Sequence, residues 1–185
     1  MRPLLLLTVG AASLIASDEL LARVTNHAGR FSAISREIWE TPELGFHEIK
    51  SSRLLQEELR ANGFTIQADV AGMPTAFVAS WGTGKPVIGL MGEFDALAGF
   101  SQKHTPTQDP VQAGAAGHAC GHNLLGAGAA LAAVAIKEQM AAHGLKGTMR
   151  YYGTPAEERG GGKIYMIHAE IWMSPFIGTL TTPIG

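Results

Sequence analysis

The 185-residue chain is long enough for one globular domain with a core, and 46% hydrophobic with 16% charged residues is typical of a soluble protein. Its formal net charge is -2 and its basic residues are scattered, which argues against a nucleic-acid partner and against a basic patch for an anionic membrane. We therefore expect a small molecule as the partner. The single cysteine cannot form an internal disulfide, so no disulfide framework indicates the compartment.

Two interpretations fit the first 17 residues, MRPLLLLTVGAASLIAS. Arg2, the apolar run at 4–16 and the small residues at its end resemble a secretory signal peptide. Alternatively, residues 1–17 begin a buried first helix that continues along the chain. The apolar run is shorter than the ~20 residues that a membrane-spanning helix needs. We leave the localisation open between cytoplasmic and, if the signal is real, secreted.

The next segments have the pattern of amphipathic helices. Apolar residues recur at mostly helical spacing over 18–40, and Pro42 and Gly45 then break the pattern. A second helix is predicted after His47, with an apolar stripe and with Gly63 placed as a C-terminal cap.

An alternation of strands and helices follows. Segments 64–70, 75–82 and 86–94 are enriched in β-branched and aromatic residues and are predicted strands, whereas 98–117 has no period and is predicted to be a loop. Asn123 is the predicted N-cap of a helix whose first turns are almost all glycine and alanine, so that it can pack closely on a sheet. A last strand begins at Gly147. This order predicts an α/β domain, a layered sheet flanked by helices, with its site at one edge of the sheet.

Three polar clusters stand where strands or loops end, and together they contain Glu93, Asp95, His118, Cys120, His122, Glu157 and Glu158. Singly, each has an ordinary explanation, as surface charge or as a buried cysteine between capping histidines. Together they offer thiolate, imidazole and carboxylate, the donors of zinc and manganese sites. In an extended segment, residues two apart point to the same side, so Cys120 and His122 can face one metal, with His118 on that side too.

The adjacent glutamates are interpreted as a divided pair. At a strand end, consecutive side chains point to opposite sides, so only one carboxylate can face a given metal. With Glu158 toward the metal, Glu157 is free to take a proton from water, which hydrolysis of an unactivated amide requires. The glycines at 160–162 would let the backbone approach a substrate or metal closely.

The motifs PELGFHE, GEFDAL, GHACGHN and GTPAEE, the last followed by GGGK, resemble the aminoacylase and carboxypeptidase type of co-catalytic metallopeptidases, in order and in rough spacing. Within that family they are similar to an amidohydrolase branch of aminobenzoyl-glutamate hydrolases and dipeptidases, and the resemblance covers roughly residues 34–166. It implies a hydrolase of N-acyl or aroyl amino acids or dipeptides that uses two divalent ions, zinc or manganese. It also implies roles for particular residues: Cys120, His122 and Glu158 as metal ligands, Glu157 as general base, and Asp95 as support behind the metal centre.

The sequence departs from this family in several ways. Arg159 replaces a usual glycine and either crowds the carboxylate pair or points to solvent. The family's lid and dimerisation domain and its two later histidine ligands do not appear, so we expect a partial catalytic domain that is inactive by itself, with homodimerisation a property of the intact relative. His168 is the only histidine after Glu158 and is expected to be exposed or capping rather than a ligand.

Residues 171–185 lack the family pattern. Reading the codons from the third base of Ile171 permits Leu-Asp-Val-Ala-Val-His-Trp-His-Pro, the family's next motif with its missing histidine ligand. We therefore expect a frameshift after about Glu170, in the genome or in its reading, and divide the chain into 1–17, a metallohydrolase part at 18–170, and an aberrant tail at 171–185.

Two other functions stay open at this stage. The first is a non-catalytic remnant or a weak metal-binding module, which metal content and turnover would distinguish from an enzyme. The second is a thiol-dependent enzyme that uses Cys120 with His118 or His122, for which the sequence offers neither an orienting group nor an oxyanion hole.

Overall fold

The computed structural model describes residues 4–171, so the expected tail lies outside the described residues except for Ile171. Residues 4–17 form the first part of one long helix. The elements are α1 (Leu4–Glu40), α2 (Ile49–Ala61), β1 (Thr65–Ala68), the 3-10 turn η1 (Val70–Gly72), β2 (Phe77–Thr83), β3 (Val87–Gly92), α3 (His122–Ala142), β4 (Gly147–Gly153), α4 (Glu157–Gly160) and α5 (Gly162–His168).

The described strands form one sheet in the order β1-β2-β4-β3. β2 pairs antiparallel with β1 and with β4, whereas β3 and β4 are parallel, with Gly92 opposite Gly153. Because these two strands are parallel, the chain leaves both at the same edge of the sheet. This edge is the one at which the sequence places its acidic residues.

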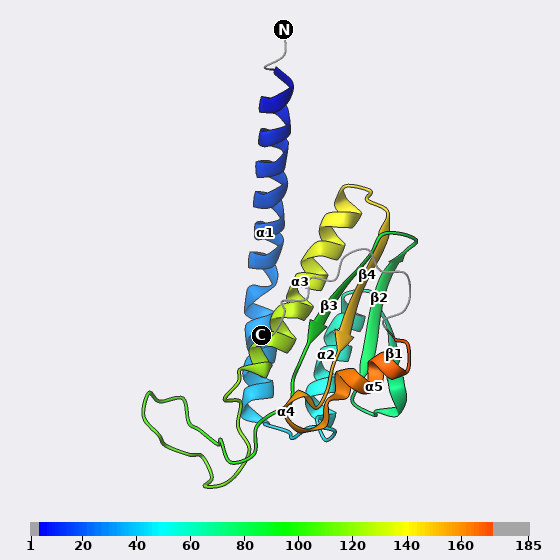
Figure 1. Cartoon of the computed structure of the whole chain (residues 1–185). Helices are drawn as coiled ribbons and strands as arrows, with labels where there is room; N and C mark the ends of the chain where they lie inside the picture. The colour runs from blue at the N-terminus through cyan, green and yellow to red at the C-terminus, as the bar shows by residue number, and fades with distance from the viewer. Residues whose placement is uncertain (1–3, 172–185) are drawn as a thin grey trace.

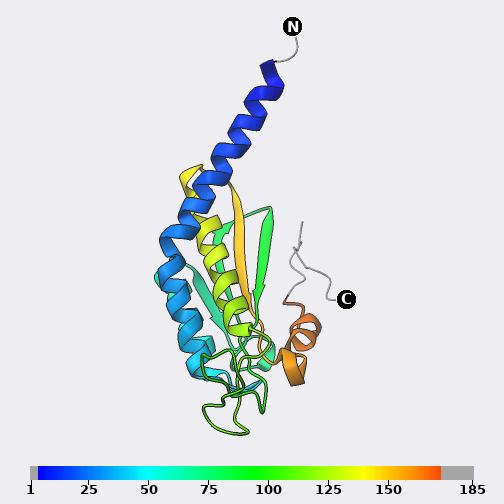
Figure 2. The same ribbon diagram turned by 90° about the vertical axis from the view of Figure 1, so that its left-hand side faces the viewer.

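Helices cover both faces of the sheet, as Figures 1 and 2 show. α1, α2 and α3 lie on one face, and α5 lies on the other. Alternate residues of β4 separate the two cores, since Tyr151 packs with the three long helices and Tyr152 packs with η1 and with Met166 of α5. The expected layered α/β arrangement is confirmed.

The helix ends agree with the sequence at one position and disagree at another. Gly63 has a φ of 84° just after the C-cap Asn62 of α2, as the cap prediction requires. The predicted N-cap of α3 was wrong, because Gly121 is the cap, with a φ of 80°, and Asn123 lies inside the helix. The Asn123 side chain instead donates to the Ser35 carbonyl and hydroxyl oxygens, 3.2 and 3.1 Å away, and so ties α3 to α1.

α3 is long and apolar enough to span a membrane by length and composition, the only such helix among the described residues that were searched. It packs, however, between α1 and strands β3 and β4. Its small residues permit that contact, because a Cβ atom added at Gly126 would lie 2.6 Å from the Glu93 carbonyl oxygen. We interpret α3 as a core helix of the domain.

The two glycines of α3 provide a matched pair for testing this contact. Gly126→Ala should lower the free energy of unfolding by about 1–3 kcal/mol, because the helix must shift away from the backbone of Glu93. Gly128→Ala should instead be neutral or add about 0.5–1 kcal/mol, since nothing lies within 4 Å of a Cβ there and alanine favours the helix. Urea unfolding of both variants measures the difference, and equal effects would contradict the close packing of α3 on the sheet.

Candidate metal centre

A cluster of acidic side chains surrounds His122 at the edge where β3 and β4 end. Glu93 and Asp95 follow β3, and Glu157 and Glu158 follow β4 after a short connection. His122 is the first residue of α3 and reaches this edge because the chain returns there after the 98–117 loop. Segments from three distant parts of the sequence therefore meet at one imidazole.

Asp95 joins these segments. Its side chain is fully buried, and its Oδ1 accepts a hydrogen bond from His122 Nδ1 at 2.9 Å. Its Oδ2 accepts the backbone N–H of Glu158 at 2.9 Å. Since a carboxylate oxygen accepts from Nδ1–H, the other ring nitrogen of His122, Nε2, is the one directed at the acidic cluster.

The charge around His122 is strongly negative. Nε2 lies 3.1 Å from Glu93 Oε2 and 3.9 Å from a carboxylate oxygen of both Glu157 and Glu158. Burial lowers the pKa of His122, but hydrogen bonds to Asp95 and Glu93 outweigh it and raise the pKa to about 10. The imidazole therefore carries a proton at neutral pH, and that proton is the positive charge that the cluster requires.

The glutamate pair does not lie at a strand end. Ala156 adopts a left-handed conformation, and Glu157 and Glu158 form the first turn of α4. The strand alternation used to divide the pair was therefore wrong, because a helical turn separates neighbouring side chains by about 100° rather than 180°. Both carboxylates turn toward His122, and Arg159 after them is exposed to solvent.

The residues fit a metal ion. One ligand atom each from His122, Glu157 and Glu158 lie within 4.8 Å of one another. Glu158 Oε1 is buried and accepts no hydrogen bond, although a buried carboxylate oxygen is costly to leave without a partner. Nitrogen and carboxylate oxygen are ligands that zinc and manganese accept.

Cys120 and His118 lie differently from the sequence expectation. Gly121 is left-handed and His122 is helical, so the segment is not extended and the spacing argument fails. Cys120 is exposed and outside the three-residue group, but it is close enough to Glu158 for a hydrogen bond that raises the pKa of its thiol to about 11. His118 Nε2 donates to the Ile38 carbonyl oxygen at 3.1 Å, which holds its ring toward the end of α1.

Two residues of the cluster had no role assigned from the sequence, Glu93 and Lys163. Glu93 contacts His122 through one oxygen and the Lys163 ammonium through the other. The hydrogen bond from His122 and the charge of Lys163 outweigh burial and lower the pKa of Glu93 to about 2. Both lie in the quoted motifs GEFDAL and GGGK, which were the only signal, since nothing local shows that α5 reaches β3.

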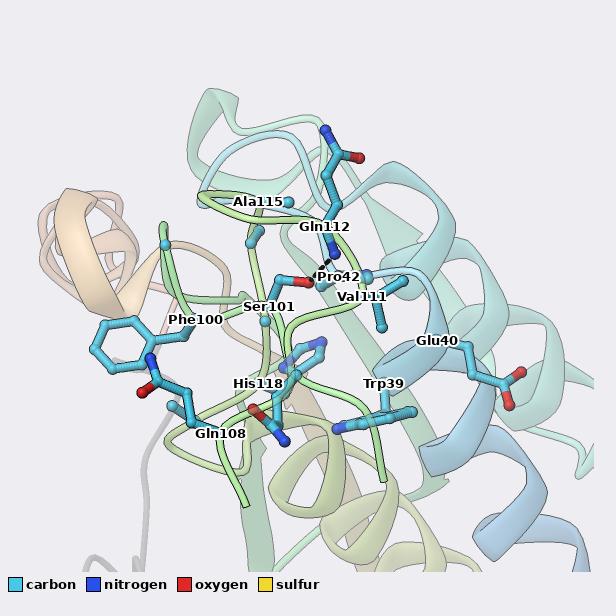
Figure 3. Close-up of a pocket in the computed structure, with 15 residues that line it drawn as sticks. Trp39, Glu40, Pro42, Phe100, Ser101, Gln108, Val111, Gln112, Ala115 and His118 are labelled. Atoms are coloured by element: carbon cyan, nitrogen blue, oxygen red, sulfur yellow. Dashed lines mark hydrogen bonds between the residues drawn. The ribbon is translucent and has the colours of Figure 1, made fainter. Parts of the chain in front are cut away.

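A pocket of about 660 Å³ lies beside this cluster in sequence but does not include it. Trp39 at the end of α1 and the loop carrying Phe100 and Ser101 form its walls, and His118 lies among them, as Figure 3 shows. The Gln112 backbone N–H donates to Ser101 Oγ at 3.2 Å and closes the loop on itself. None of the acidic residues around His122 lines this pocket.

Known proteins share the sequence and the fold of this chain. Residues 89–180 match peptidase family M20/M25/M40. The chain is 46% identical over 144 residues to a p-aminobenzoyl-glutamate hydrolase of Escherichia coli, covering 77% of this chain and 30% of that protein. It is 36% identical over 164 residues to the human Xaa-Arg dipeptidase, covering 77% and 33% of the two chains.

A solved structure shares the fold. A dinuclear metal-binding peptidase of the M20 family from Bacillus subtilis superposes with a TM-score of 0.63 at 28% identity, covering 81% of this chain and 40% of that one. The chain spans about a third of the length of the curated relatives it matches. Shared sequence, shared fold and the acidic cluster at the ends of β3 and β4 agree, and the chain therefore belongs to peptidase family M20/M25/M40.

Proposed function

We propose that this chain forms the metal-binding part of an amidohydrolase that cleaves N-acyl or N-aroyl amino acids or dipeptides. The observation that carries the proposal is the convergence of His122, Glu157 and Glu158, with a buried oxygen of Glu158 left without a partner. The relatives support the substrate class, since their names are those of a p-aminobenzoyl-glutamate hydrolase, a dipeptidase and a hippurate hydrolase.

Each residue has a proposed role in this reaction. His122, Glu158 and Cys120 would hold divalent metal, zinc or manganese, of which the intact protein would bind two ions. When bound, such an ion supplies Lewis acidity toward water and toward the amide carbonyl. Asp95 fixes the ring of His122 through Nδ1, as carboxylates commonly do behind a metal-binding histidine.

Glu157 is the proposed general base. Its side chain is 37% exposed, whereas that of Glu158 is 14% exposed, so Glu157 is the carboxylate that an entering substrate and water can reach. It would accept a proton from the attacking water and return it to the leaving amine. We also propose that the intact protein is a homodimer.

The thiol-dependent alternative is disfavoured by the surroundings of Cys120. A nucleophilic cysteine needs a lowered pKa, but acceptance by Glu158 and the nearby carboxylates raise the pKa of this thiol to about 11. The weak metal-binding module remains the second candidate, because it needs the same ligands without turnover.

Zinc binding tests the ligand set in the 185-residue chain. Isothermal titration should detect binding that Cys120→Ala and Glu158→Gln each weaken by about tenfold or more, because each removes a proposed ligand. His168→Ala is the matched control and should bind as the unmodified chain does, since His168 is exposed at the end of α5 and outside the cluster. If Cys120→Ala binds zinc as tightly as the unmodified chain, Cys120 is removed from the ligand set.

The pH dependence of zinc affinity should report which protons the ion displaces. His122, with a pKa of about 10, and Cys120, with a pKa of about 11, are both protonated at pH 6–8, so affinity should rise with pH by about a hundredfold per unit. In Cys120→Ala the slope should fall to about tenfold per unit, since one proton fewer is released. An unchanged slope in that variant would show that the thiol is not deprotonated on binding.

Glu157→Gln separates catalysis from metal binding. In a chimera of residues 1–170 with the remaining sequence of the Escherichia coli relative, turnover of aminobenzoyl-glutamate should fall by about a hundredfold or more, because an amide cannot accept the proton. Metal content by elemental analysis should stay unchanged. Loss of metal in Glu157→Gln, with metal retained in Glu158→Gln, would reverse the two assignments, and an inactive chimera with full metal content would favour the binding module.

A further inference from the structure

The PELGFHE motif at residues 42–48 has no part in the function proposed above, yet its last residue is completely buried. Glu48 is 0% exposed, and both of its carboxylate oxygens have partners. Oε1 accepts the backbone N–H of Ala156 at 2.8 Å, and Oε2 accepts the hydroxyl of Thr75 at 3.0 Å. Glu48 therefore connects the start of α2 to the residue immediately before the glutamate pair.

Ala156 has an unfavourable conformation. Its φ is 56° and its ψ is 44°, in the left-handed region that residues with a Cβ atom rarely adopt. The same motif provides the space, because a Cβ atom on Gly45 would lie 2.9 Å from the Ala156 Cβ atom. Ala156 also begins the turn, since its carbonyl oxygen accepts the N–H groups of Gly160 and Gly162.

The orientation of the next two residues depends on this conformation. An extended Ala156 would continue β4 and send Glu157 and Glu158 to opposite sides, whereas the left-handed Ala156 starts α4 and turns both toward His122. The Ala156 residue is buried, and in the observed conformation its N–H has the Glu48 carboxylate as partner. Removing that acceptor would leave a buried donor unsatisfied and favour a different conformation.

We propose that Glu48 is a positioning residue that holds Ala156 in the left-handed conformation and thereby aims Glu157 and Glu158 at His122. Its expected effect on metal affinity rests on the function proposed above, but its effect on the backbone does not. The interaction needs an acceptor oxygen at this place rather than a negative charge. Glutamine should therefore substitute for Glu48, and leucine, which fills similar space without an acceptor, should not.

Hydrogen exchange at the Ala156 amide tests the backbone step in the 185-residue chain without metal. In the unmodified chain this amide should exchange slowly, as do amides of the neighbouring strand β4. Glu48→Leu should speed its exchange by about tenfold or more relative to β4, and Glu48→Gln should keep it within about threefold. Fast exchange of the Ala156 amide in the unmodified chain would overturn the proposal without any variant.

Zinc affinity of the same variants tests the consequence for the site. Glu48→Leu should weaken binding by about tenfold and Glu48→Gln by no more than about threefold. Leu59→Ala is the control for general destabilisation, because Leu59 is buried in the core at the far end of α2, and it should lower the melting temperature but not the affinity. Equal losses in Glu48→Leu and Glu48→Gln would show that charge matters and would overturn the proposal. If the unmodified chain binds no zinc, the proposed metal site fails, and the exchange data still decide the role of Glu48.

Discussion

The buried carboxylate of Asp95 is the contact on which the arrangement of the site depends. One oxygen orients His122 at the start of α3, and the other accepts the backbone N–H of Glu158 at the start of α4. A fully buried carboxylate is stable only when its oxygens are paired, so the two helix starts must meet at Asp95 for the domain to fold. The parallel pairing of β3 and β4 makes that meeting possible, because it brings Asp95 and Glu158 to one edge of the sheet.

The sequence predicted the parts of this fold that depend on local pattern. β4 has the predicted start, the other three strands lie within or beside their predicted segments, and Gly63 ends α2 as a left-handed glycine. The candidate residues could also be selected, since thiol, imidazole and carboxylate at strand and loop ends are unusual in combination. Periodicity and residue chemistry are both readable within a short window, so these predictions needed no tertiary information.

The geometry of the site could not be predicted in the same way. Placing Glu157 and Glu158 at a strand end ignored Ala156, whose left-handed conformation is imposed by Glu48, 108 residues earlier in the chain. Likewise, the side chain of His118 is directed away from its neighbours by the Ile38 carbonyl oxygen, 80 residues earlier. Both departures come from single hydrogen bonds between distant segments, and such contacts override local backbone preference without leaving a sequence pattern.

The same carboxylates that suit the site for metal make it costly to fold. Four carboxylates surround one imidazole, and in the metal-free protein the compensating charges are the proton on His122 and the ammonium of Lys163. A divalent ion would replace that proton and add one positive charge, and it would give the unpartnered oxygen of Glu158 a ligand. Binding would therefore relieve repulsion and desolvation that are already present in the fold, so the left-handed Ala156 and the buried Glu48 hold together a site whose charge is completed by a cation.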